Sequence, residues 1–326
     1  MRLRTRLTER LGIEHPIISA PMGFIAGGRL AAAMSNAGGL GLLGGGYGDA
    51  QWLERELAAA GNARIGCGFI TWSLARKPEL LDAVLARRPA AVMLSFGAVE
   101  PFAAAVRGAG ARLICQVQTM AHARAALAAG ADILVAQGGE AGGHGGHRAT
   151  LTLVPEIADW LAHEAPEILL VAAGGIADGR GLAAALMLGA DGVLIGSRLV
   201  ASEESLAPPG FKLAILAADG DATIKTGVID VVRGLDWPDG FSGRALRTRF
   251  VMDWHGREPA LAEPSTVAAE AERYWQGFRA GEVDDTGVFV GEAAGLIRAI
   301  RPVRASVDAS VGEAAALLGN AALRVR

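Results

Sequence analysis

Few cysteines, little net charge and no long apolar run distinguish this sequence of 326 residues. Its two cysteines, Cys67 and Cys115, lie in apolar runs, which indicates reduced core thiols without a disulfide framework. The formal charge is -3 and no lysine- and arginine-rich stripe occurs, which argues against nucleic-acid or anionic-membrane partners. No stretch approaches the roughly 20 apolar residues that cross a bilayer, and residues 1–16 lack the apolar core of a secretory signal. We therefore expect a cytoplasmic protein.

Short apolar runs alternate with alanine-rich amphipathic segments through the first two thirds of the chain. The runs are almost continuous in hydrophobicity, as is typical of parallel strands that are covered on both faces. We expect strands at Pro16–Ala20, Gly39–Leu43, Ile65–Phe69, Ala91–Ser95, Arg112–Val117, Ile133–Ala136, Ile168–Ala173 and Gly192–Gly196. This repetition predicts an α/β fold, the (β/α)8 TIM barrel; the number of strands disfavours the main alternative, a doubly wound sheet.

The pattern changes after Ser205, where Pro208-Pro209-Gly210 interrupts the chain. The following residues contain Trp237 and Trp254 but show no alternation of strands and helices. We expect residues 208–310 to form a mostly helical cap over the barrel mouth, which shapes the substrate region. Residues 1–207 and 311–326 would form the barrel, with a last helix over about 311–323 that packs back onto it.

A glycine-rich loop, Gln137 to His147, follows the sixth expected strand. Six of its eleven residues are glycines, which allow the backbone to approach a flat or phosphorylated ligand closely. His144 is the candidate reactive group because imidazole titrates near neutral pH, and His147 is its competitor. The two histidines only weakly indicate a zinc site, because no third His, Cys or carboxylate ligand lies at suitable spacing. Glu140 could equally stabilise the loop.

Two further glycine motifs follow the seventh and eighth expected strands. They are Gly174-Gly175, within the run Ala173–Gly179, and Gly196-Ser197. In TIM barrels the loops after these two strands often hold a phosphate on backbone N–H groups and a helix N-terminus. The pair therefore indicates a phosphate-bearing ligand, although glycine is also common in ordinary tight turns.

Four motifs together resemble the nitronate monooxygenase family, formerly called 2-nitropropane dioxygenases. They are Ala20-Pro21-Met22, the run Q-G-G-E-A-G-G-H from Gln137 to His144, Gly174–Gly181, and Gly196-Ser197-Arg198. The resemblance covers roughly residues 5–205. It implies a TIM barrel that binds FMN noncovalently and oxidises alkyl nitronates with O₂ to carbonyl compounds and nitrite. By the same resemblance His144 is the active-site histidine, and the FMN is lined by Ala20, Pro21, Met22, Gln137, Gly142, Gly143, Gly174, Gly175, Gly196 and Ser197.

The sequence departs from the family pattern at two positions. Gly68 stands at or near a position where the family often has asparagine, and Ser197 replaces the commoner threonine. The related FMN-dependent enoyl reductases share the E-A-G-G-H run but tend to carry Gly-Gly-Met where this chain has Ala20-Pro21-Met22.

Two alternatives to nitronate oxidation stay open. One is an NAD(P)H-dependent FMN reductase acting on a quinone or enoyl thioester, and the other is a non-catalytic phosphate- or nucleotide-binding barrel. The expected partners are a small nitronate and O₂, with a homo-oligomer as a possibility and no nucleic acid or membrane.

Overall fold

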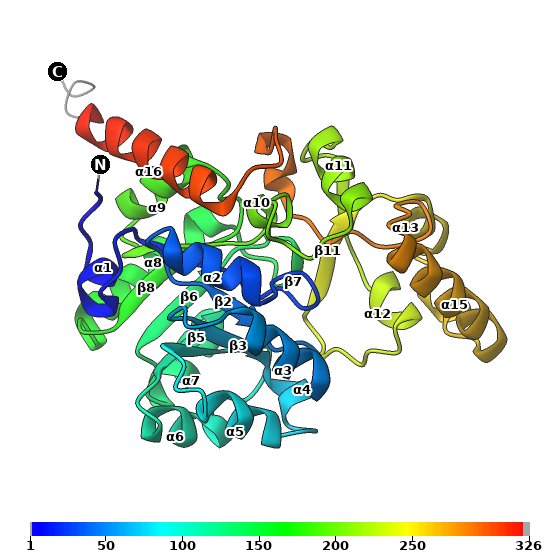
Figure 1. Cartoon of the computed structure of the whole chain (residues 1–326), viewed down its shortest axis with the longest axis horizontal. Helices are drawn as coiled ribbons and strands as arrows, with labels where there is room; N and C mark the ends of the chain where they lie inside the picture. The colour runs from blue at the N-terminus through cyan, green and yellow to red at the C-terminus, as the bar shows by residue number, and fades with distance from the viewer. Residues whose placement is uncertain (1, 322–326) are drawn as a thin grey trace.

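The computed structural model describes residues 2–321 and contains a closed barrel of eight parallel strands (Figure 1). The strand order is β1-β9-β8-β6-β5-β4-β3-β2, and parallel pairing of Ile18 with Leu40 joins the two ends. At this seam the Leu40 N–H donates to the Ile17 carbonyl at 2.9 Å and the Ser19 N–H donates to the Leu40 carbonyl at 3.0 Å. The strands are β1 (Ile17–Ser19), β2 (Leu42–Gly44), β3 (Gly66–Ile70), β4 (Ala91–Ser95), β5 (Arg112–Val117), β6 (Ile133–Gln137), β8 (Leu169–Ala173) and β9 (Gly192–Ile195). The expected TIM barrel is thereby confirmed.

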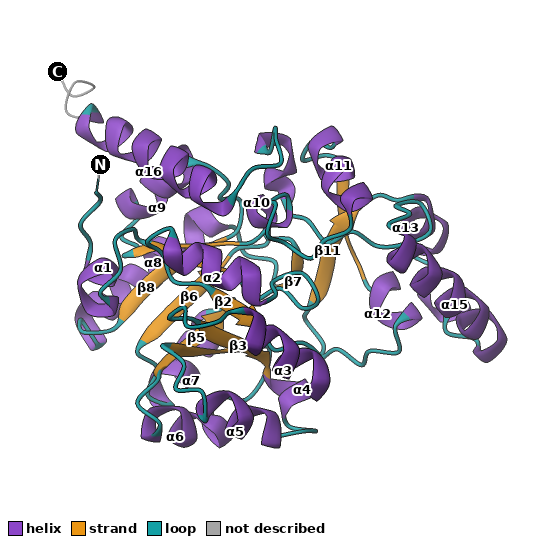
Figure 2. Cartoon of the chain, viewed as in Figure 1, coloured by secondary structure: helices purple, strands orange, loops and turns teal. Residues whose placement is uncertain are grey.

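Helices surround this barrel, as the secondary-structure colouring shows (Figure 2). The helices of the barrel region are α1 (Arg6–Leu11), α2 (Gly28–Asn36), α3 (Ala50–Ala59), α4 (Thr71–Leu74), α5 (Glu79–Leu85), α6 (Glu100–Gly108), α7 (Met120–Ala128), α8 (Thr150–Glu164), α9 (Gly179–Met187), α10 (Ser197–Val200) and α16 (Val303–Gly319). The last of these, α16, packs against α9 and α2. None of the helices within residues 2–321 is long and apolar enough to cross a membrane.

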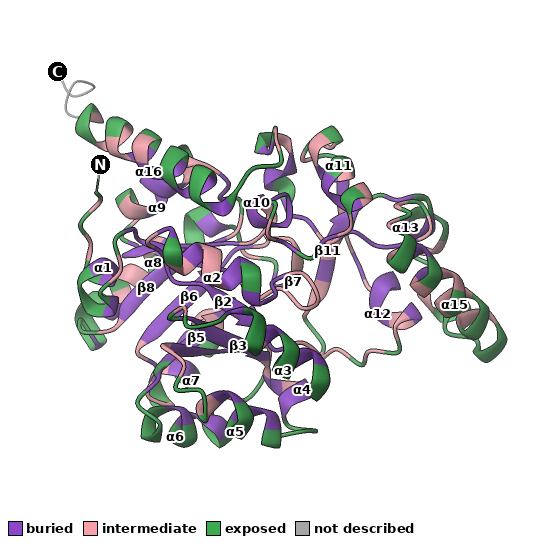
Figure 3. Cartoon of the chain, viewed as in Figure 1, coloured by how far each residue is buried: buried purple, intermediate pink, exposed green. Residues whose placement is uncertain are grey.

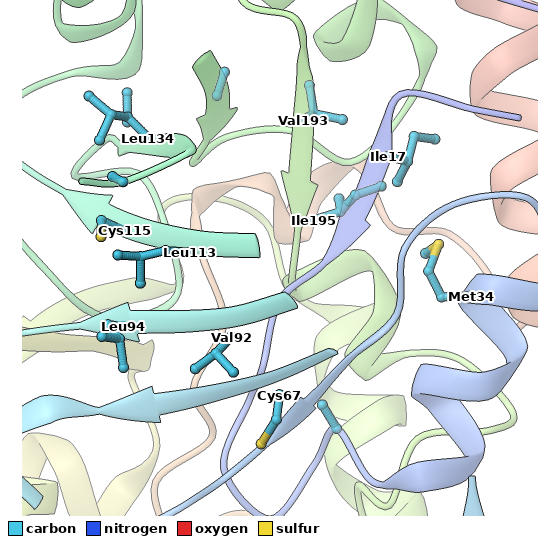
Figure 4. Close-up of a cluster of buried hydrophobic side chains, with 14 of the residues drawn as sticks. Ile17, Met34, Cys67, Val92, Leu94, Leu113, Cys115, Leu134, Val193 and Ile195 are labelled. Atoms are coloured by element: carbon cyan, nitrogen blue, oxygen red, sulfur yellow. The ribbon is translucent and has the colours of Figure 1, made fainter. Parts of the chain in front are cut away.

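Buried apolar side chains fill both the barrel interior and the layer between strands and helices. The barrel strands are accordingly coloured mostly as buried in Figure 3. Cys67 and Cys115 belong to the outer layer, where Figure 4 shows them among branched aliphatic side chains. Both are free thiols. Burial raises the pKa of Cys115 to about 12 and raises that of Cys67 further, so both sulfurs are protonated. The cysteines therefore serve as packing residues, as their apolar sequence surroundings indicate.

Residues 208–310 build a second region beside the barrel (Figure 1). Its elements are α11 (Pro209–Ala217), β10 (Thr223–Thr226), α12 (Val228–Val232), β11 (Ser242–Leu246), α13 (Arg249–Trp254), α14 (Glu258–Leu261), α15 (Pro264–Ala280) and the 3₁₀-helix η1 (Glu292–Leu296). Helices predominate in this region, and it also contains the two strands β10 and β11, which the expectation of a mostly helical cap did not include.

The two strands that the sequence did not reveal, β10 and β11, form an antiparallel sheet with β7 (Gly143–Gly145). The sheet was missed because its third strand comes from the glycine-rich loop, about a hundred residues upstream, and glycine has low strand propensity. The last helix also starts earlier than expected, at Val303 instead of residue 311. Residues 322–326 of the expected barrel segment lie outside the described residues.

Candidate functional site

One cavity opens at the carboxyl ends of the barrel strands, where residues of the 208–310 region also reach. Its wall contains every site residue that the sequence motifs single out: Ala20, Pro21, Met22, Gln137, Gly142, Gly143, His144, Gly174, Gly175, Gly196 and Ser197. These residues follow four different strands of the barrel or lie in β7. The carboxyl ends of parallel strands form one face of a barrel, and for that reason motifs far apart in sequence meet here.

His144 lies at the centre of β7 and is held from both its backbone and its ring. The β7–β11 ladder pairs it with Gly243, and the imidazole Nε2 lies 2.9 Å from each carboxylate oxygen of Asp230. Only 4% of the His144 side chain and 9% of the Asp230 side chain are exposed. An ionised carboxylate only accepts hydrogen bonds, so Nε2 carries a proton and Nδ1 is the nitrogen left for a ligand. His147, in contrast, is exposed and lies outside the cavity wall.

Asp230 is a site residue that the sequence reasoning missed. It lies in α12, within the apolar run Val228-Ile229-Asp230-Val231-Val232, and α12 precedes the loop that carries Trp237. A single carboxylate in such an apolar run indicates a buried charge that has a partner, because burying a charge is costly unless a partner compensates it. Its partner, however, lies 86 residues away in sequence and could not be identified without the fold.

An aromatic wall faces the imidazole. The Trp237 ring is stacked on the His144 ring with centroids 3.4 Å apart and planes inclined by 3°. Phe96 contacts Trp237 edge-on at 5.0 Å, and Phe289 lies 5.4 Å from His144. The indole N–H of Trp237 is buried without a hydrogen-bond partner among residues 2–321. This side of the cavity thus offers flat apolar surfaces and one unused donor to a ligand.

The Gln137 amide links the barrel to the glycine-rich loop. Its Nε2 donates to the His144 carbonyl at 2.9 Å, while its Oε1 accepts from Gln118 at 2.9 Å and from Gln116 at 3.0 Å. One N–H of this amide remains for a ligand, while the amide oxygen is fully used within the protein. The main structural effect of the Gln137 side chain is to fix the His144 carbonyl, next to the imidazole ring.

A carboxylate braces the start of the glycine-rich loop. Glu140 accepts hydrogen bonds from the Thr150 N–H at 2.9 Å and from the Thr150 hydroxyl at 2.9 Å. The Thr150 hydroxyl is also 3.2 Å from the Gly174 carbonyl. Glu140 is therefore a loop brace, one of the two roles that its position allows.

Free backbone donors gather at the ends of β8 and β9. Within the described chain, no hydrogen-bond partner is found for the N–H groups of Gly174, Gly175 and Gly196. Gly174 has φ +104°, and a Cβ there would lie 2.9 Å from the Thr150 hydroxyl, so only glycine fits. Unpaired N–H groups of this kind can donate hydrogen bonds to phosphate oxygens. They therefore fit the phosphate of a flavin nucleotide.

The N-terminus of α9 does not share this role. Asp178 caps it by accepting from the Arg180 and Gly181 N–H groups, and Glu313 accepts from the Gly179 N–H at 2.9 Å. The hydroxyl of Ser197 accepts a hydrogen bond from the Gly291 N–H at 2.9 Å, and its own proton is available to donate. The amides of Gly174, Gly175 and Gly196 and the Ser197 hydroxyl, and not the N-terminus of α9, are thus the available phosphate donors.

The departure at Gly68 has a steric explanation. A Cβ at this position would lie 2.2 Å from Cγ and 2.5 Å from Cβ of Pro21. The Pro21 ring therefore occupies the space that a side chain at position 68 would need. Gly68 and Pro21 form a matched pair, and an asparagine amide could not be accommodated without moving the strand exit.

This chain is similar in sequence and fold to several known proteins. The sequence matches the family model described as nitronate monooxygenase over residues 4–64 and 71–310. It is 37% identical to nitronate monooxygenase npaC of Metarhizium robertsii, with 93% of this chain and 91% of that protein covered. It is 39% identical to a Mycobacterium tuberculosis hydroxy-methyl-oxo-octahydro-indene-carboxyl-CoA dehydrogenase, with 77% and 68% covered. The solved structure of FabK from Thermotoga maritima has a TM-score of 0.86 at 30% identity, with 99% and 100% covered.

Proposed function

Because this chain belongs to the nitronate monooxygenase family and is an oxidoreductase, we propose that it binds FMN and oxidises alkyl nitronates. The products would be carbonyl compounds and nitrite, with O₂ as the oxidant. One observation carries the proposal: a buried imidazole, fixed by a carboxylate, shares its cavity with three free backbone N–H groups. Such a cavity suits a phosphorylated, flat cofactor beside a polar reacting group.

The proposed cofactor site divides between the two ends of the cavity. The N–H groups of Gly174, Gly175 and Gly196 and the Ser197 hydroxyl would hold the phosphate. Ala20, Pro21, Met22, Gln137, Gly142 and Gly143 would line the ring system. When bound, FMN supplies the electron-accepting chemistry that amino-acid side chains lack. In this division the barrel carries the cofactor and residues 208–310 shape the substrate side.

His144 is the proposed catalytic residue. Its Nε2 proton is engaged by Asp230, and Trp237 covers one face of the ring. A substrate would therefore meet the imidazole at Nδ1, in the plane of the ring. Nδ1 lacks a proton when Nε2 carries the only one, so it can accept the α-proton of a neutral nitroalkane. With a second proton on Nδ1, the ring would instead donate to the nitro oxygens of a nitronate.

An anaerobic titration tests the proposal. The purified protein should show the visible absorption of oxidised flavin, and a small alkyl nitronate should bleach it while NADH does not. Bleaching by NADH alone would favour the reductase alternative. A preparation that neither contains nor takes up FMN would contradict the proposed function, and would leave the non-catalytic barrel as the better explanation.

A further inference from the structure

A half-buried arginine with no acidic partner among residues 2–321 reaches the same cavity. Arg233 follows α12 directly, three residues after Asp230, and lies in the cavity wall. Its guanidinium carbon lies 4.9 Å from the centre of the Tyr47 ring, 5.5 Å from that of Trp275 and 5.8 Å from that of Phe24. These rings position the charged group by cation–π contacts, which hold a cation without neutralising it.

The positive charge of Arg233 has no counterion in the part of the chain that the structure describes. No carboxylate there lies within 4.0 Å of the guanidinium, and Asp230, the acid closest in sequence, is engaged by His144. Its Nε is buried without a hydrogen-bond partner among residues 2–321. Burial raises the pKa of Tyr47 to about 12, although the charge of Arg233 acts in the opposite direction, so the phenol is neutral. A charged group that is largely shielded from water is normally paired, so this half-buried guanidinium without a carboxylate indicates a ligand as its partner.

We infer that Arg233 is an oxyanion receptor of this site: it binds a carboxylate or phosphate group carried by the molecule that reacts beside His144. A guanidinium offers two parallel N–H donors that match the two oxygens of such a group. Because Asp230 and Arg233 flank one turn at the end of α12, this helix would set both the orientation of His144 and the position of the anionic group. The assignment of the reacting site rests on the proposed function, whereas oxyanion binding by Arg233 is measurable without turnover.

The first experiment measures binding alone. FMN-loaded protein is titrated with propionate and with its neutral analogue propionamide, and the flavin absorbance and tryptophan fluorescence are followed. The wild-type protein should bind propionate at least about tenfold more tightly than propionamide, and Arg233→Gln should lose this preference. Arg257→Gln is the matched control, because Arg257 lies over the Trp254 ring at 5.1 Å but is exposed and outside the cavity wall.

The variants also separate oxyanion binding from a purely structural role in holding α12 on the barrel. Arg233→Lys keeps the charge but loses the paired donors, so propionate binding should weaken by about three- to tenfold. If Arg233→Gln does not fold, an unchanged propionate affinity in Arg233→Lys would overturn the inference. A folded Arg233→Gln variant that keeps the wild-type binding of both propionate and the phosphate-bearing ligand NADPH, or that loses FMN instead, would also overturn it.

A second arm identifies the source of the oxyanion. Anaerobic titration with NADPH supplies a phosphate-bearing ligand, and propionate supplies a carboxylate. Weaker binding of either ligand in Arg233→Gln supports the inference and shows whether the bound oxyanion is a carboxylate or a phosphate. Unchanged binding of both ligands rejects the inference. If the wild-type protein prefers propionate but oxidises no nitronate, the proposed function fails while the role of Arg233 stands.

Discussion

The Asp230 carboxylate places both of its oxygens 2.9 Å from Nε2 of His144, across a sequence separation of 86 residues. One partner comes from the glycine-rich loop of the barrel and the other from α12 of the 208–310 region. A buried ionised acceptor of this kind determines which imidazole nitrogen carries the proton and how the ring is turned. The reactive group of the proposed site is therefore set jointly by the two regions of the chain.

Replacing His144 with alanine should leave the protein yellow but remove most of its turnover of nitronates. The side chain is the only titratable group in the cavity wall besides Tyr47 and Arg233 among residues 2–321. General acid–base assistance typically contributes about 10²- to 10⁴-fold, so kcat should fall within that range. Steady-state kinetics with FMN occupancy from the absorbance spectrum check this. His147→Ala, at an exposed position, is the control and should behave as the wild type; full activity in His144→Ala would reject the assignment.

Replacing Asp230 with asparagine should lower kcat and leave FMN occupancy unchanged. Asp230 acts through His144, and a hydrogen bond to a charged group contributes about 1.5–3 kcal/mol, which corresponds to about 10- to 100-fold in rate. A double-mutant cycle provides the decisive readout. In the His144→Ala background the Asp230→Asn change should have almost no further effect on kcat. An equal loss in both backgrounds would mean that Asp230 supports the fold and not the imidazole.

Adding a methyl group at Gly68 should destabilise the protein because of the Pro21 ring. The new Cβ would lie 2.2 Å from Pro21 Cγ, and overpacking of this kind costs about 1–3 kcal/mol. Urea unfolding of Gly68→Ala, Pro21→Gly and the double variant measures the coupling between the two positions, because Pro21→Gly removes both of the atoms that the new Cβ would meet. The double variant should be more stable than the sum of the single changes predicts. Strict additivity would show that the two residues do not compete for the same space.

Alkaline pH should weaken the fold through the two buried thiols. Their pKa values are raised above the ordinary value of 9.0, so the unfolded chain releases these protons first as pH rises. The contribution of the two protonated thiols to the free energy of unfolding is fully present below about pH 9. Above that pH it falls by up to about 1.4 kcal/mol per pH unit for each thiol. Urea unfolding from pH 8 to pH 10 measures the slope. Cys67→Ala together with Cys115→Ala should flatten it, and an unchanged slope would assign the effect to other groups.

The sequence predicted the barrel well because its strands are apolar runs buried on both faces, a local signal. Ala91–Ser95 and Arg112–Val117 coincide with β4 and β5 to the residue. The glycine motifs share one cavity wall because the carboxyl ends of barrel strands converge on one face. Asp230, Trp237 and Arg233 were not assigned roles, since each acts through a partner distant in sequence. β11 was missed for the same reason, because its pairing with β7 is a long-range contact.

The strand β7 makes His144 part of a sheet whose other two strands are encoded much later in the chain. On a ribosome, the loop would emerge long before β10 and β11 exist to pair with it, and before α12 can supply Asp230. A nascent chain that ends shortly after β9 could have its apolar strands but not an oriented imidazole. Orientation of the imidazole in the proposed site therefore requires the chain to be made at least as far as β11.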